Sequence, residues 1–486
     1  MIFFDMKKEL TFALNYALNK GFQIHPDAFK ILENVDVKKL EKIIKEVVRE
    51  KSKQKLFQIN QDDLETYLGI KEDLTLQSEV EVLFDPTTKI TTGEGVDGYN
   101  ALFSSRFNKL KRIISDRPES KKLKSIASVK TTKSEGDMYV CGLVTTRIVE
   151  RNITKLVLED PSGSFEGIVF DDELQKIVGT LLIDQFVMLR IGLGKNSGFI
   201  IKDLILPDIP EQPINKSETE VYAVFLSDLH IGSTYFMEEE FMEFVSWLSS
   251  PDPVARKIRF VLIGGDVVDG VGIYPNQDKE LVCLTIEEQL KKAVNLIDKI
   301  PKNVKVIIMP GNHDPGGRAL PQPAIPKKYN SSLWEMENVV MVGNPAVVSL
   351  NGVKVMMFHG QSIDDIVKTT PGLSYNRPTN VMKHLLRARH LSPIYGSQTP
   401  IAPEMEDLLV IEDVPDIFHV GHVHRAELDM YKGILLVNSG SWQRQTPFQA
   451  SVGMTPNPGI ALMVNLKTFK VFHQNYNSNS ENILQS

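Results

Sequence analysis

Five apolar runs of strand length, each ending abruptly in polar residues, constrain the fold of this chain more than any other feature. Their ends are Asp228-Leu229-His230, Gly264-Gly265-Asp266, Gly311-Asn312-His313-Asp314, His359-Gly360 and Gly421-His422-Val423-His424. Such runs indicate buried strands, and open α/β sheets bind ligands at the carboxyl ends of their strands. Residues 236–248 and 285–300 have the apolar spacing of amphipathic helices. The order predicts β-α-β-α-β, with the polar residues at one edge of a sheet.

The polar residues at these strand ends have the chemistry of metal ligands. A single Asp-x-His is as consistent with a turn and a surface histidine as with a metal site, but its repetition in five motifs favours the metal site. The glycines let the backbone turn sharply and bring an ion close to the main chain. Mixed oxygen and nitrogen donors without a thiolate suit Mn²⁺, Fe or Zn better than Mg²⁺, which prefers oxygen.

In combination the five motifs resemble the calcineurin-like metallophosphoesterases, over residues 220–470. The resemblance implies a β-sandwich flanked by helices, with two divalent cations about 3.5–4 Å apart that activate a water for attack on phosphorus. It implies that Asp266 bridges the ions, and it divides the other ligands into a first set of Asp228, His230 and His424 and a second set of Asn312, His359 and His422. His313 would lie over the phosphate as a catalytic residue, and Asp314 would orient it.

Residues 126–206 change character to short strands punctuated by turns. Strands are predicted over residues 138–148, 154–159, 164–170, 186–192 and 198–206, with a helical piece over residues 172–177 between the third and the fourth. This is the order of elements in an OB-fold barrel. The barrel contains few aromatic residues for stacking on bases, which favours docking of another protein, or docking with backbone contact.

The remaining segments connect or flank these two domains, and residues 1–70 carry no recognisable chemistry. We predict a helical module over residues 1–70 (helices over 5–19, 25–32, 36–52 and 61–68), a linker and basic segment over 71–125, a Pro-rich hinge over 207–219 and a disordered tail over 471–486. Residues 93–98 match G-x-G-x-x-G, but they do not directly follow a strand, so a flexible turn is favoured over a nucleotide loop. The fold class is multidomain α/β plus β.

Basic residues are concentrated between Arg106 and Lys133. Ten lie in this interval, against only Asp116 and Glu119. The segregation fits a surface that contacts phosphates, but it fits a solvated amphipathic helix equally well. If the first interpretation holds, the candidate DNA contacts are Lys121, Lys122 and Lys124.

Composition excludes several other classes of protein. The chain has 55 basic and 62 acidic residues, so no global field attracts nucleic acid. Its two cysteines, Cys141 and Cys283, cannot build a disulfide framework or a cysteine zinc site. The N-terminal sequence lacks the pattern of a signal peptide, and no apolar run approaches the ~18 residues of a membrane span. We therefore expect a cytoplasmic protein.

The order of helical module, basic segment, OB barrel and phosphoesterase is more specific than its last domain alone. It is accompanied by five phrases: Leu-Glu-Asp-Pro-Ser-Gly (158–163), His-Gly-Gln-Ser-Ile-Asp-Asp (359–365), Pro-Gly-Leu-Ser-Tyr (371–375), Arg-His-Leu (389–391) and Pro-Asp-Ile-Phe-His (415–419). Over residues 75–470 the chain resembles the small subunits of archaeal D-family replicative DNA polymerases, in the polymerase B-subunit superfamily.

This second resemblance implies a function. It implies a Mn²⁺-dependent 3′–5′ exonuclease that proofreads single-stranded or frayed DNA 3′ ends for a separate, large polymerase subunit. Eukaryotic B-subunits share the layout but have lost metal ligands, whereas this chain keeps every one. A stand-alone phosphodiesterase and a non-catalytic scaffold remain as alternatives, and binding to a sliding clamp stays open.

Overall fold

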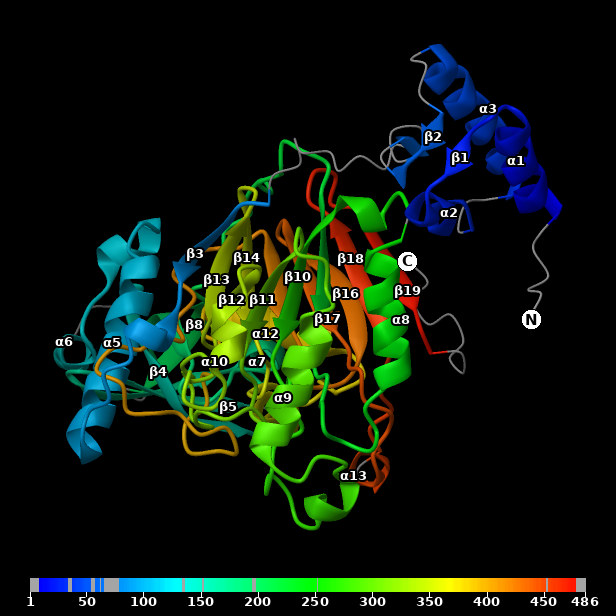
Figure 1. Ribbon diagram of the computed structural model, residues 1–486. Helices are drawn as coiled ribbons and strands as arrows, with labels where there is room; N and C mark the ends of the chain where they lie inside the picture. The colour runs from blue at the N-terminus through cyan, green and yellow to red at the C-terminus, as the bar shows by residue number, and fades with distance from the viewer. Residues whose placement is uncertain are drawn as a thin grey trace. The chain divides into compact units, whose positions relative to one another are not determined.

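The computed structural model describes most of the chain (Figure 1). The described residues are 8–33, 37–53, 57–61, 63–64, 78–132, 136–150, 153–194, 198–250, 252–451 and 453–477. The chain divides into two compact units, one of residues 1–77 with 245–258 and the other of residues 78–244 with 259–486. Within the described residues, no helix has the length and apolar character needed to cross a membrane.

The smaller unit is helical, as the spacing of its apolar residues predicts. Its elements are α1 (Lys8–Asn19), β1 (Gln23–Ile24), α2 (Pro26–Glu33), α3 (Val37–Lys53) and β2 (Gln58–Ile59). The helices bury a common core that includes Ala13, Leu32 and Ile44. The two strands pair in parallel, and their length of two residues is too short for a recognisable alternation in the sequence. The fourth predicted helix falls mostly outside the described residues.

A closed barrel confirms the OB-fold prediction. Its strand order is β4-β5-β6-β8-β7, with β4 (Met138–Val149), β5 (Thr154–Asp160), β6 (Gly163–Val169), β7 (Phe186–Leu193) and β8 (Phe199–Ile205). As predicted, a helix, α7 (Asp172–Val178), separates the third and fourth strands in the sequence. The core of the barrel is completed by Ile126 and Val129 of α6 (Ile126–Thr131).

The rest of the larger unit is built on two six-stranded sheets. The first has the order β12-β11-β10-β9-β18-β19, with β9 (Tyr222–Leu226), β10 (Ile258–Gly264), β11 (Lys305–Met309), β12 (Val339–Met341), β18 (Ile460–Asn465) and β19 (Val471–Asn475). The second has the order β16-β17-β15-β14-β13-β3, with β3 (Val80–Phe84), β13 (Ala346–Leu350), β14 (Val353–Phe358), β15 (Ile417–Val420), β16 (Ala426–Tyr431) and β17 (Ile434–Ser439).

The two sheets pack face to face as a sandwich. Phe225 of β9 contacts His419 of β15 across the interface, with ring centroids 5.0 Å apart. The helices of this part are α8 (Glu238–Leu248), α9 (Ile286–Ile297), α10 (Ser331–Glu335), α11 (Ile363–Thr369), α12 (Pro378–Ala388) and α13 (Pro447–Ser451). The helices α8 and α9 match the two predicted between the first three apolar runs. These observations confirm the predicted β-sandwich flanked by helices.

The sequence analysis expects the five apolar runs to lie in one sheet, and the structure shows that this expectation is wrong. The runs that become β9, β10 and β11 belong to the first sheet, whereas β14 and β15 belong to the second. Apolar character identifies a buried strand but does not say which sheet the strand joins. The ligands still converge, because the motif loops that follow strands of both sheets lie together at one end of the sandwich.

Three of the predicted connecting segments are part of the folded unit. Residues 80–84, expected in a linker, form β3 and pair antiparallel with β13. The flexible turn expected over residues 93–98 is wrong, because residues 95–98 form the first turn of the long helix α5 (Gly95–Ile113). The expected hinge, 207–219, is held in place: Ile209 is buried, and Asn215 donates its backbone N–H to Asp416 (2.8 Å). The expected tail, 471–486, begins with β19, and its residues after 477 are not among the described ones.

The helix α5 joins the barrel to the sandwich, and this corrects one interpretation of the basic segment. Phe107 of α5 packs on Phe186 of the barrel, with ring centroids 5.7 Å apart. Arg106 is fully buried and donates from Nε to Asp407 (2.8 Å). Lys109 lies 2.7 Å from a carboxylate oxygen of Glu412. The first basic residues of the segment therefore hold the unit together and are not available to phosphates.

Candidate metal centre

Five of the predicted ligands share an unusual backbone conformation. Asp228, His230, Asp266, His422 and His424 have positive φ angles of 50–69°. Residues other than glycine rarely occupy this left-handed region, and such strain collects at functional sites. Each of the five follows the carboxyl end of β9, β10 or β15. The left-handed turns direct these side chains away from their strands and into a common pocket.

Two motif glycines let the loops approach one another. A Cβ atom on Gly311 would collide with Oδ1 of Asp266, and one on Gly421 would collide with Oγ of Ser227 and lie 2.6 Å from Oδ2 of Asp228. No residue with a side chain fits in these places without a shift of the neighbouring loop. The glycines of Gly-Asn-His and Gly-His-Val-His therefore serve to bring the ligands together.

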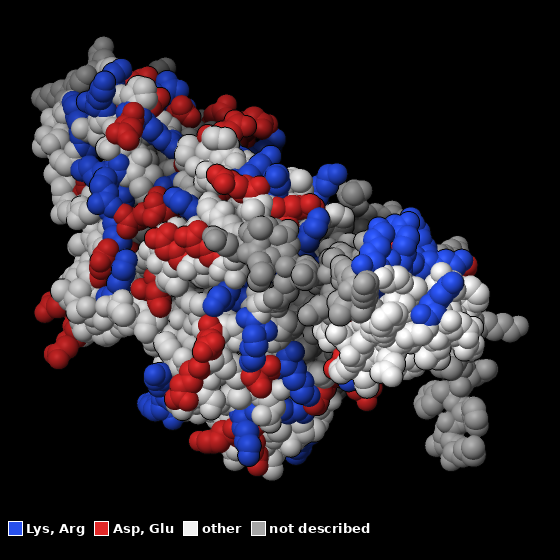
Figure 2. All heavy atoms as spheres, turned by 45° about the horizontal axis from the view of Figure 1, so that its top comes forward, with Lys and Arg blue, Asp and Glu red and all other residues white. Residues whose placement is uncertain are grey.

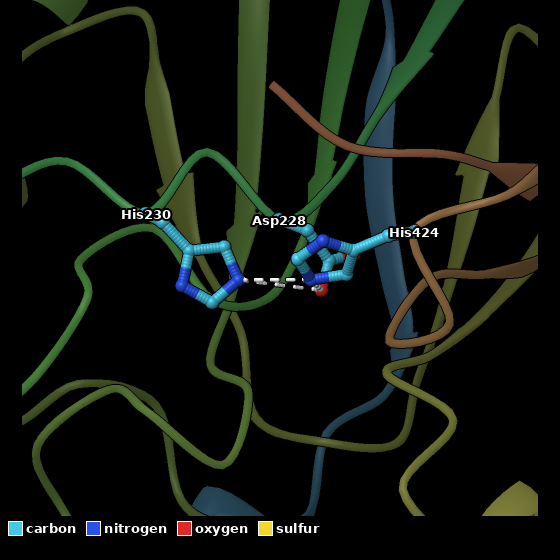
Figure 3. A group of neighbouring side chains, drawn as sticks. All are labelled: Asp228, His230 and His424. Carbon is cyan, nitrogen blue, oxygen red and sulfur yellow. Dashed lines mark hydrogen bonds and ion pairs between the residues drawn. The ribbon is translucent and has the colours of Figure 1, made fainter. Parts of the chain in front are cut away.

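The first predicted ligand set, Asp228, His230 and His424, comes together at the end of β9 (Figure 3). Nε2 of His424 lies 3.4 Å from Oδ1 of Asp228 and 3.1 Å from Nε2 of His230. This Oδ1 is buried and has no hydrogen-bond partner within the described part of the chain. A buried polar atom of this kind is costly unless something pairs with it. A cation bound by the three side chains would satisfy it, so the residues fit a metal ion.

Asp266 occupies the position expected of a bridging ligand. Its Oδ2 lies 3.3 Å from Nε2 of His359 and 3.8 Å from Nε2 of His230. These two imidazoles belong to different predicted ion sites, so one carboxylate oxygen faces both. The other oxygen, Oδ1, accepts a hydrogen bond from the backbone N–H of His313 (2.8 Å). That bond fixes the orientation of the carboxylate.

The second predicted set gathers on the other side of Asp266. Oδ1 of Asn312 lies 3.0 Å from Nε2 of His359. His422 joins Asp266 and His359 in a group whose ligand atoms all lie within 4.8 Å of one another. Its Nε2 is also 3.2 Å from Oδ2 of Asp364. The structure therefore brings together all seven residues that the sequence analysis assigns as ligands.

Hydrogen bonds on the outer side of the site orient two of the imidazoles. Nδ1 of His230 contacts Oδ1 of Asp269 (3.0 Å), and Nδ1 of His359 contacts the carbonyl oxygen of Gly264 (2.9 Å). Facing oxygen acceptors, these nitrogens carry the proton and donate, which leaves the lone pair of Nε2 free for a cation. A metal ion can therefore bind these two rings only at Nε2, where it would displace the proton that the neighbouring carboxylates favour.

His313 lies within the site, where its ligand atom is grouped with those of His230 and Asp266, but Asp314 does not orient it. Nδ1 of His313 donates to the carbonyl oxygen of Asp269 (2.7 Å). The carboxylate of Asp314 instead accepts the backbone N–H groups of Val267, Val268 and Gly311 (2.8–3.1 Å). Asp314 therefore fixes the loops around Asp266, and the expectation that it orients His313 is wrong. Burial and the neighbouring Asp266 raise the pKa of Asp314 to about 7.

Asp269 is the residue that the sequence analysis missed. Its carboxylate holds His230 and also accepts from the side-chain amides of Gln277 (2.8 Å) and Gln443 (3.0 Å), while its carbonyl holds His313. It stands three residues after Asp266, and a second carboxylate so close to a metal motif is the signal that could have found it. It links a predicted ligand to the predicted phosphate-side histidine.

The electrostatics of the pocket favour positive charge. Burial opposes ionisation of Asp228, but nearby imidazoles, His424 first, lower its pKa to about 2. Burial likewise opposes ionisation of Asp266, but His359 and His313 hold its pKa well below the usual range. In turn, burial disfavours the charged form of His359, but Asp266 raises its pKa to about 10. Two ionised, buried carboxylates require positive charge nearby, which protonated imidazoles or metal ions can supply.

The candidate DNA contacts lie elsewhere. Lys121, Lys122 and Lys124 are exposed, the first two in the 3₁₀ helix η2 (Pro118–Lys122). They do not line the pocket that contains the metal ligands. On the face drawn in Figure 2, basic and acidic side chains are interspersed over the larger unit, so no broad field of one sign marks a nucleic-acid path there. Their role stays a prediction.

Comparison with known proteins first gives the class of protein. Residues 223–427 match the family model of the B-subunit of DNA polymerases alpha and epsilon. That range begins in β9 and ends in β16, so it contains every one of the seven predicted ligands. The sandwich that carries the site is therefore a DNA polymerase B-subunit domain.

Longer relatives give the particular family: the chain belongs to the DNA polymerase II small subunits. It is 40% identical over 386 residues to the Archaeoglobus fulgidus small subunit, covering 78% of this chain and 77% of that one. It is 36% identical over 423 residues to that of Pyrococcus furiosus (83% and 68%). It is also 36% identical over 402 residues to that of Methanothermobacter thermautotrophicus (81% and 82%).

Solved structures show only a distant likeness. One is an archaeal phosphodiesterase, 12% identical, which matches 52% of this chain and 99% of its own with a TM-score of 0.28. Another is a predicted phosphoesterase from Streptococcus pneumoniae, 16% identical, which matches 54% and 92% with a TM-score of 0.26. Likenesses of this level carry no conclusion about activity.

Proposed function

We propose that this chain is the proofreading subunit of its polymerase, a 3′–5′ exonuclease that hydrolyses phosphodiester bonds at DNA 3′ ends with two divalent cations. One observation carries the proposal: the seven predicted ligand residues lie together, six of them in groups of close ligand atoms and Asn312 in contact with His359. Buried, ionised carboxylates cost desolvation free energy, and here they face imidazoles that can themselves bind metal ions, which favours a metal site over a scaffold.

The donor set suits particular ions. It offers two carboxylates, one amide and four imidazoles, a mixture that fits Mn²⁺ best, with Fe and Zn as close alternatives and Mg²⁺ less favoured. When bound, such a pair of ions activates a water and offsets the negative charge that develops on the phosphate. The protein's part would be to hold the two ions together against their mutual repulsion through the carboxylate of Asp266, and to present His313 to the phosphate.

The hydrogen bonds of His313 determine what it can do. Its Nδ1 donates to the carbonyl of Asp269, so a neutral ring can only accept a proton at Nε2, and a protonated ring can donate from Nε2. Burial lowers the pKa of His313, whereas the negative charge of a bound phosphate raises it. A protonated His313 would donate to a phosphate oxygen or to the leaving 3′-oxygen.

The proposal includes a large catalytic subunit as partner. The relatives of this chain are small subunits of a polymerase, and a proofreading site needs a polymerase to deliver frayed ends. We propose that the OB barrel and the adjacent sandwich surface dock the partner. In support, Ile148 and Val149 at the end of β4 are apolar and exposed, which is typical of an interface when such residues cluster.

The test is an assay of cleavage polarity. The chain, alone and in complex with the large subunit from the same source, is mixed with Mn²⁺ and 5′-labelled DNA that ends in a mismatched 3′ nucleotide. We expect a ladder that shortens from the 3′ end, stops with a chelator, and is blocked by a phosphorothioate at the terminal linkage. Endonucleolytic products, or hydrolysis of small phosphodiesters with none of DNA, would favour a stand-alone phosphodiesterase. No hydrolysis of either substrate would favour the scaffold.

A further inference from the structure

We infer that Tyr274 and Phe448 form a base-binding subsite, on which the nucleobase of the terminal 3′ nucleotide stacks. This inference rests on the proposed function, because it names the part of the DNA that these two residues receive. Both residues line the pocket of about 390 Å³ that contains His230, Asp266 and His313. Neither belongs to the motifs that supply the ligands.

The two rings lie at the right place for this role. Tyr274 has its ring centroid 6.5 Å from that of His313, the residue expected beside the phosphate. Phe448 follows, with its ring 6.4 Å from Tyr274 and an angle of only 20° between the planes. His313, Tyr274 and Phe448 therefore form a series of neighbouring rings that begins at the residue expected beside the phosphate.

The aromatic pair also leaves surface free for a ligand. A centroid separation of 6.4 Å is near the far end of the range for aromatic pairs, so the rings cover little of one another. Phe448 is 59% exposed, although burial of a phenylalanine is strongly favoured. Every nucleobase presents a flat π surface, and proteins that bind single strands use such aromatic platforms without regard to sequence. A proofreading site must likewise accept any mispaired base.

Hydrogen bonds fix Tyr274 relative to the metal ligands. Its hydroxyl donates to Glu280 (3.1 Å). In the same loop the side-chain amide of Gln277 donates to Oδ2 of Asp269 (2.8 Å). Because Asp269 also holds His230, the loop that carries Tyr274 is anchored to a ligand of the first predicted ion.

Phe448 is fixed independently, through a different ligand. It lies on the short helix α13, whose next residue, Gln449, contacts Nδ1 of His424 through its side-chain amide (2.8 Å). The backbone N–H of Thr446 donates to the Oε1 of the same Gln449 (3.0 Å). Two separate segments thus present an aromatic ring to the pocket, and each is connected to a metal-ligand candidate. This arrangement sets the distance between the rings and the reaction centre.

Other residues that line the pocket, among them Asp364, Lys368 and Gln398, are polar and suit the rest of the strand. The hydroxyl of Tyr375 hydrogen-bonds to Asp364, which contacts His422. Tyr375 also lines the neighbouring pocket of about 140 Å³, which contains Arg425. A phosphodiester backbone that leaves by this route meets a cation and polar groups, whereas the terminal base meets the two aromatic rings. The geometry therefore assigns the base to Tyr274 and Phe448.

The first test detects stacking without any hydrolysis. DNA with 2-aminopurine as its 3′-terminal base is bound to the polymerase complex with Ca²⁺ in place of Mn²⁺. We expect the wild-type protein to quench the fluorescence, and Phe448→Ala and Tyr274→Leu to lose the quenching. The matched control is Phe472→Ala, which removes an exposed phenylalanine from β19, and it should quench as the wild type does. Quenching that survives Phe448→Ala, or is absent in the wild type, overturns the inference.

The second test uses the reaction itself. In single-turnover assays with Mn²⁺, Phe448→Ala should lower the efficiency on a base-bearing 3′ end about 5- to 150-fold, the range for loss of one base–aromatic stack. Hydrolysis of an abasic 3′ end should not change. An equal loss on both ends would make Phe448 structural and overturn the inference. If the wild-type complex hydrolyses neither end, the proposed function fails, while the fluorescence experiment still decides the subsite.

Discussion

The metal-ligand loops and the helix α5 both concentrate ionisable residues, but the fold uses the two sets in opposite ways. In the loops, Oδ1 of Asp228 is buried and has no hydrogen-bond partner among the described residues. In α5, the equally buried Arg106 donates to Asp407 (2.8 Å) and to the carbonyl oxygen of Pro393 (2.6 Å), and only its Nη2 has no partner among the described residues. Lys109 and Arg112 of the same helix pair with Glu412. The helix set pairs with fixed opposite charges of the chain, whereas the carboxylates of the loop set face imidazoles, whose protons metal ions can replace.

This difference teaches that the position of a charged residue says more than the number of charged residues. The ligands follow strand ends in left-handed turns, which point several side chains at one place. The basic residues of α5 follow a helix, so they spread around its surface and find acids wherever the helix packs. The basic residues between Arg106 and Lys133 include some that pair with acids within the fold and others that are exposed, and a count of charges does not separate the two groups.

The largest expected effect comes from changing Asp266, the residue at the centre of the metal-ligand loops. Asp266→Asn removes the charge that faces both predicted ions, so nuclease activity should be abolished and both ions should bind weakly. Metal content after dialysis and hydrolysis of a 3′ end measure the two effects, and circular dichroism checks the fold. Asp278→Asn, the same substitution at an exposed acid, is the control. Near-normal hydrolysis by Asp266→Asn would make the two-metal assignment wrong.

The next effect separates chemistry from metal binding. His313→Ala removes a side chain whose Nε2 lies 3.9 Å from Asp266 but which is held by a backbone carbonyl of Asp269. We expect two ions per site to remain and the single-turnover rate to fall about 10²–10⁴-fold, the usual cost of losing a positioned acid. Loss of metal in step with activity would identify His313 as a ligand. An unchanged rate would leave it without a role.

The sequence predicts the ligand set well because the chemistry requires particular residue types at strand ends. Asp228, His230 and Asp266 are recognisable from the apolar run before them, whichever sheet the run joins. The assignment of the runs to two sheets was not predictable, because the pairing of β18 beside β9, or of β3 beside β13, depends on residues far away in the sequence. Local patterns fix elements, and long-range pairing fixes sheets.

The outer side of the site was predictable only in part. A pattern places His313 and Asp314 next to each other, but it cannot say that Asp314 turns to the backbone of Val267 while Asp269 holds His313. The same limit applies to Arg106. Its burial follows from where α5 packs, and nothing in a run of lysines and arginines reveals which member meets a buried acid such as Asp407.

The ion pairs of α5 can be broken at Arg106. Arg106→Met leaves the carboxylate of Asp407 buried without its main counter-charge, which costs about 3–5 kcal/mol of unfolding free energy. Arg112→Met, on the same helix but at an exposed pair with Glu412, should cost less than about 1 kcal/mol. Denaturant unfolding of both variants gives the comparison. Equal costs would mean that burial does not distinguish the two pairs.

The same cluster should make stability depend on pH. Burial, assisted by Arg106, lowers the pKa of His390 to about 4, and its neutral ring accepts from the backbone N–H of Ser392 (3.0 Å) and contacts Asp407. An unfolded histidine takes up a proton near pH 6.5. Between pH 6.5 and 4 the unfolded chain therefore binds the extra proton, and stability falls with decreasing pH, by up to about 3 kcal/mol.

The variant His390→Gln isolates this contribution. Glutamine keeps an N–H donor for Asp407 but does not titrate, so the difference in unfolding free energy between pH 7.5 and 5 should be smaller than in the wild type. Other groups titrate equally in both proteins and cancel. A pH dependence that is unchanged in the variant would show that His390 is already charged, or freely titrating, in the folded protein.

The smallest expected effect concerns the exposed half of the basic segment, which sharpens the comparison from the other side. Lys121, Lys122 and Lys124 lie beyond α5 and are exposed, so they are free to contact phosphates in a way that Arg106 is not. Replacing all three by glutamine should weaken DNA binding and lower the salt slope of the binding constant by up to about 2–3 units. The control replaces Lys302, Lys327 and Lys328 by glutamine. These lysines are exposed elsewhere on the unit, and their replacement removes the same amount of charge. If both triple variants change the slope equally, net charge alone is responsible. If neither changes it, the three lysines form an ordinary solvated surface.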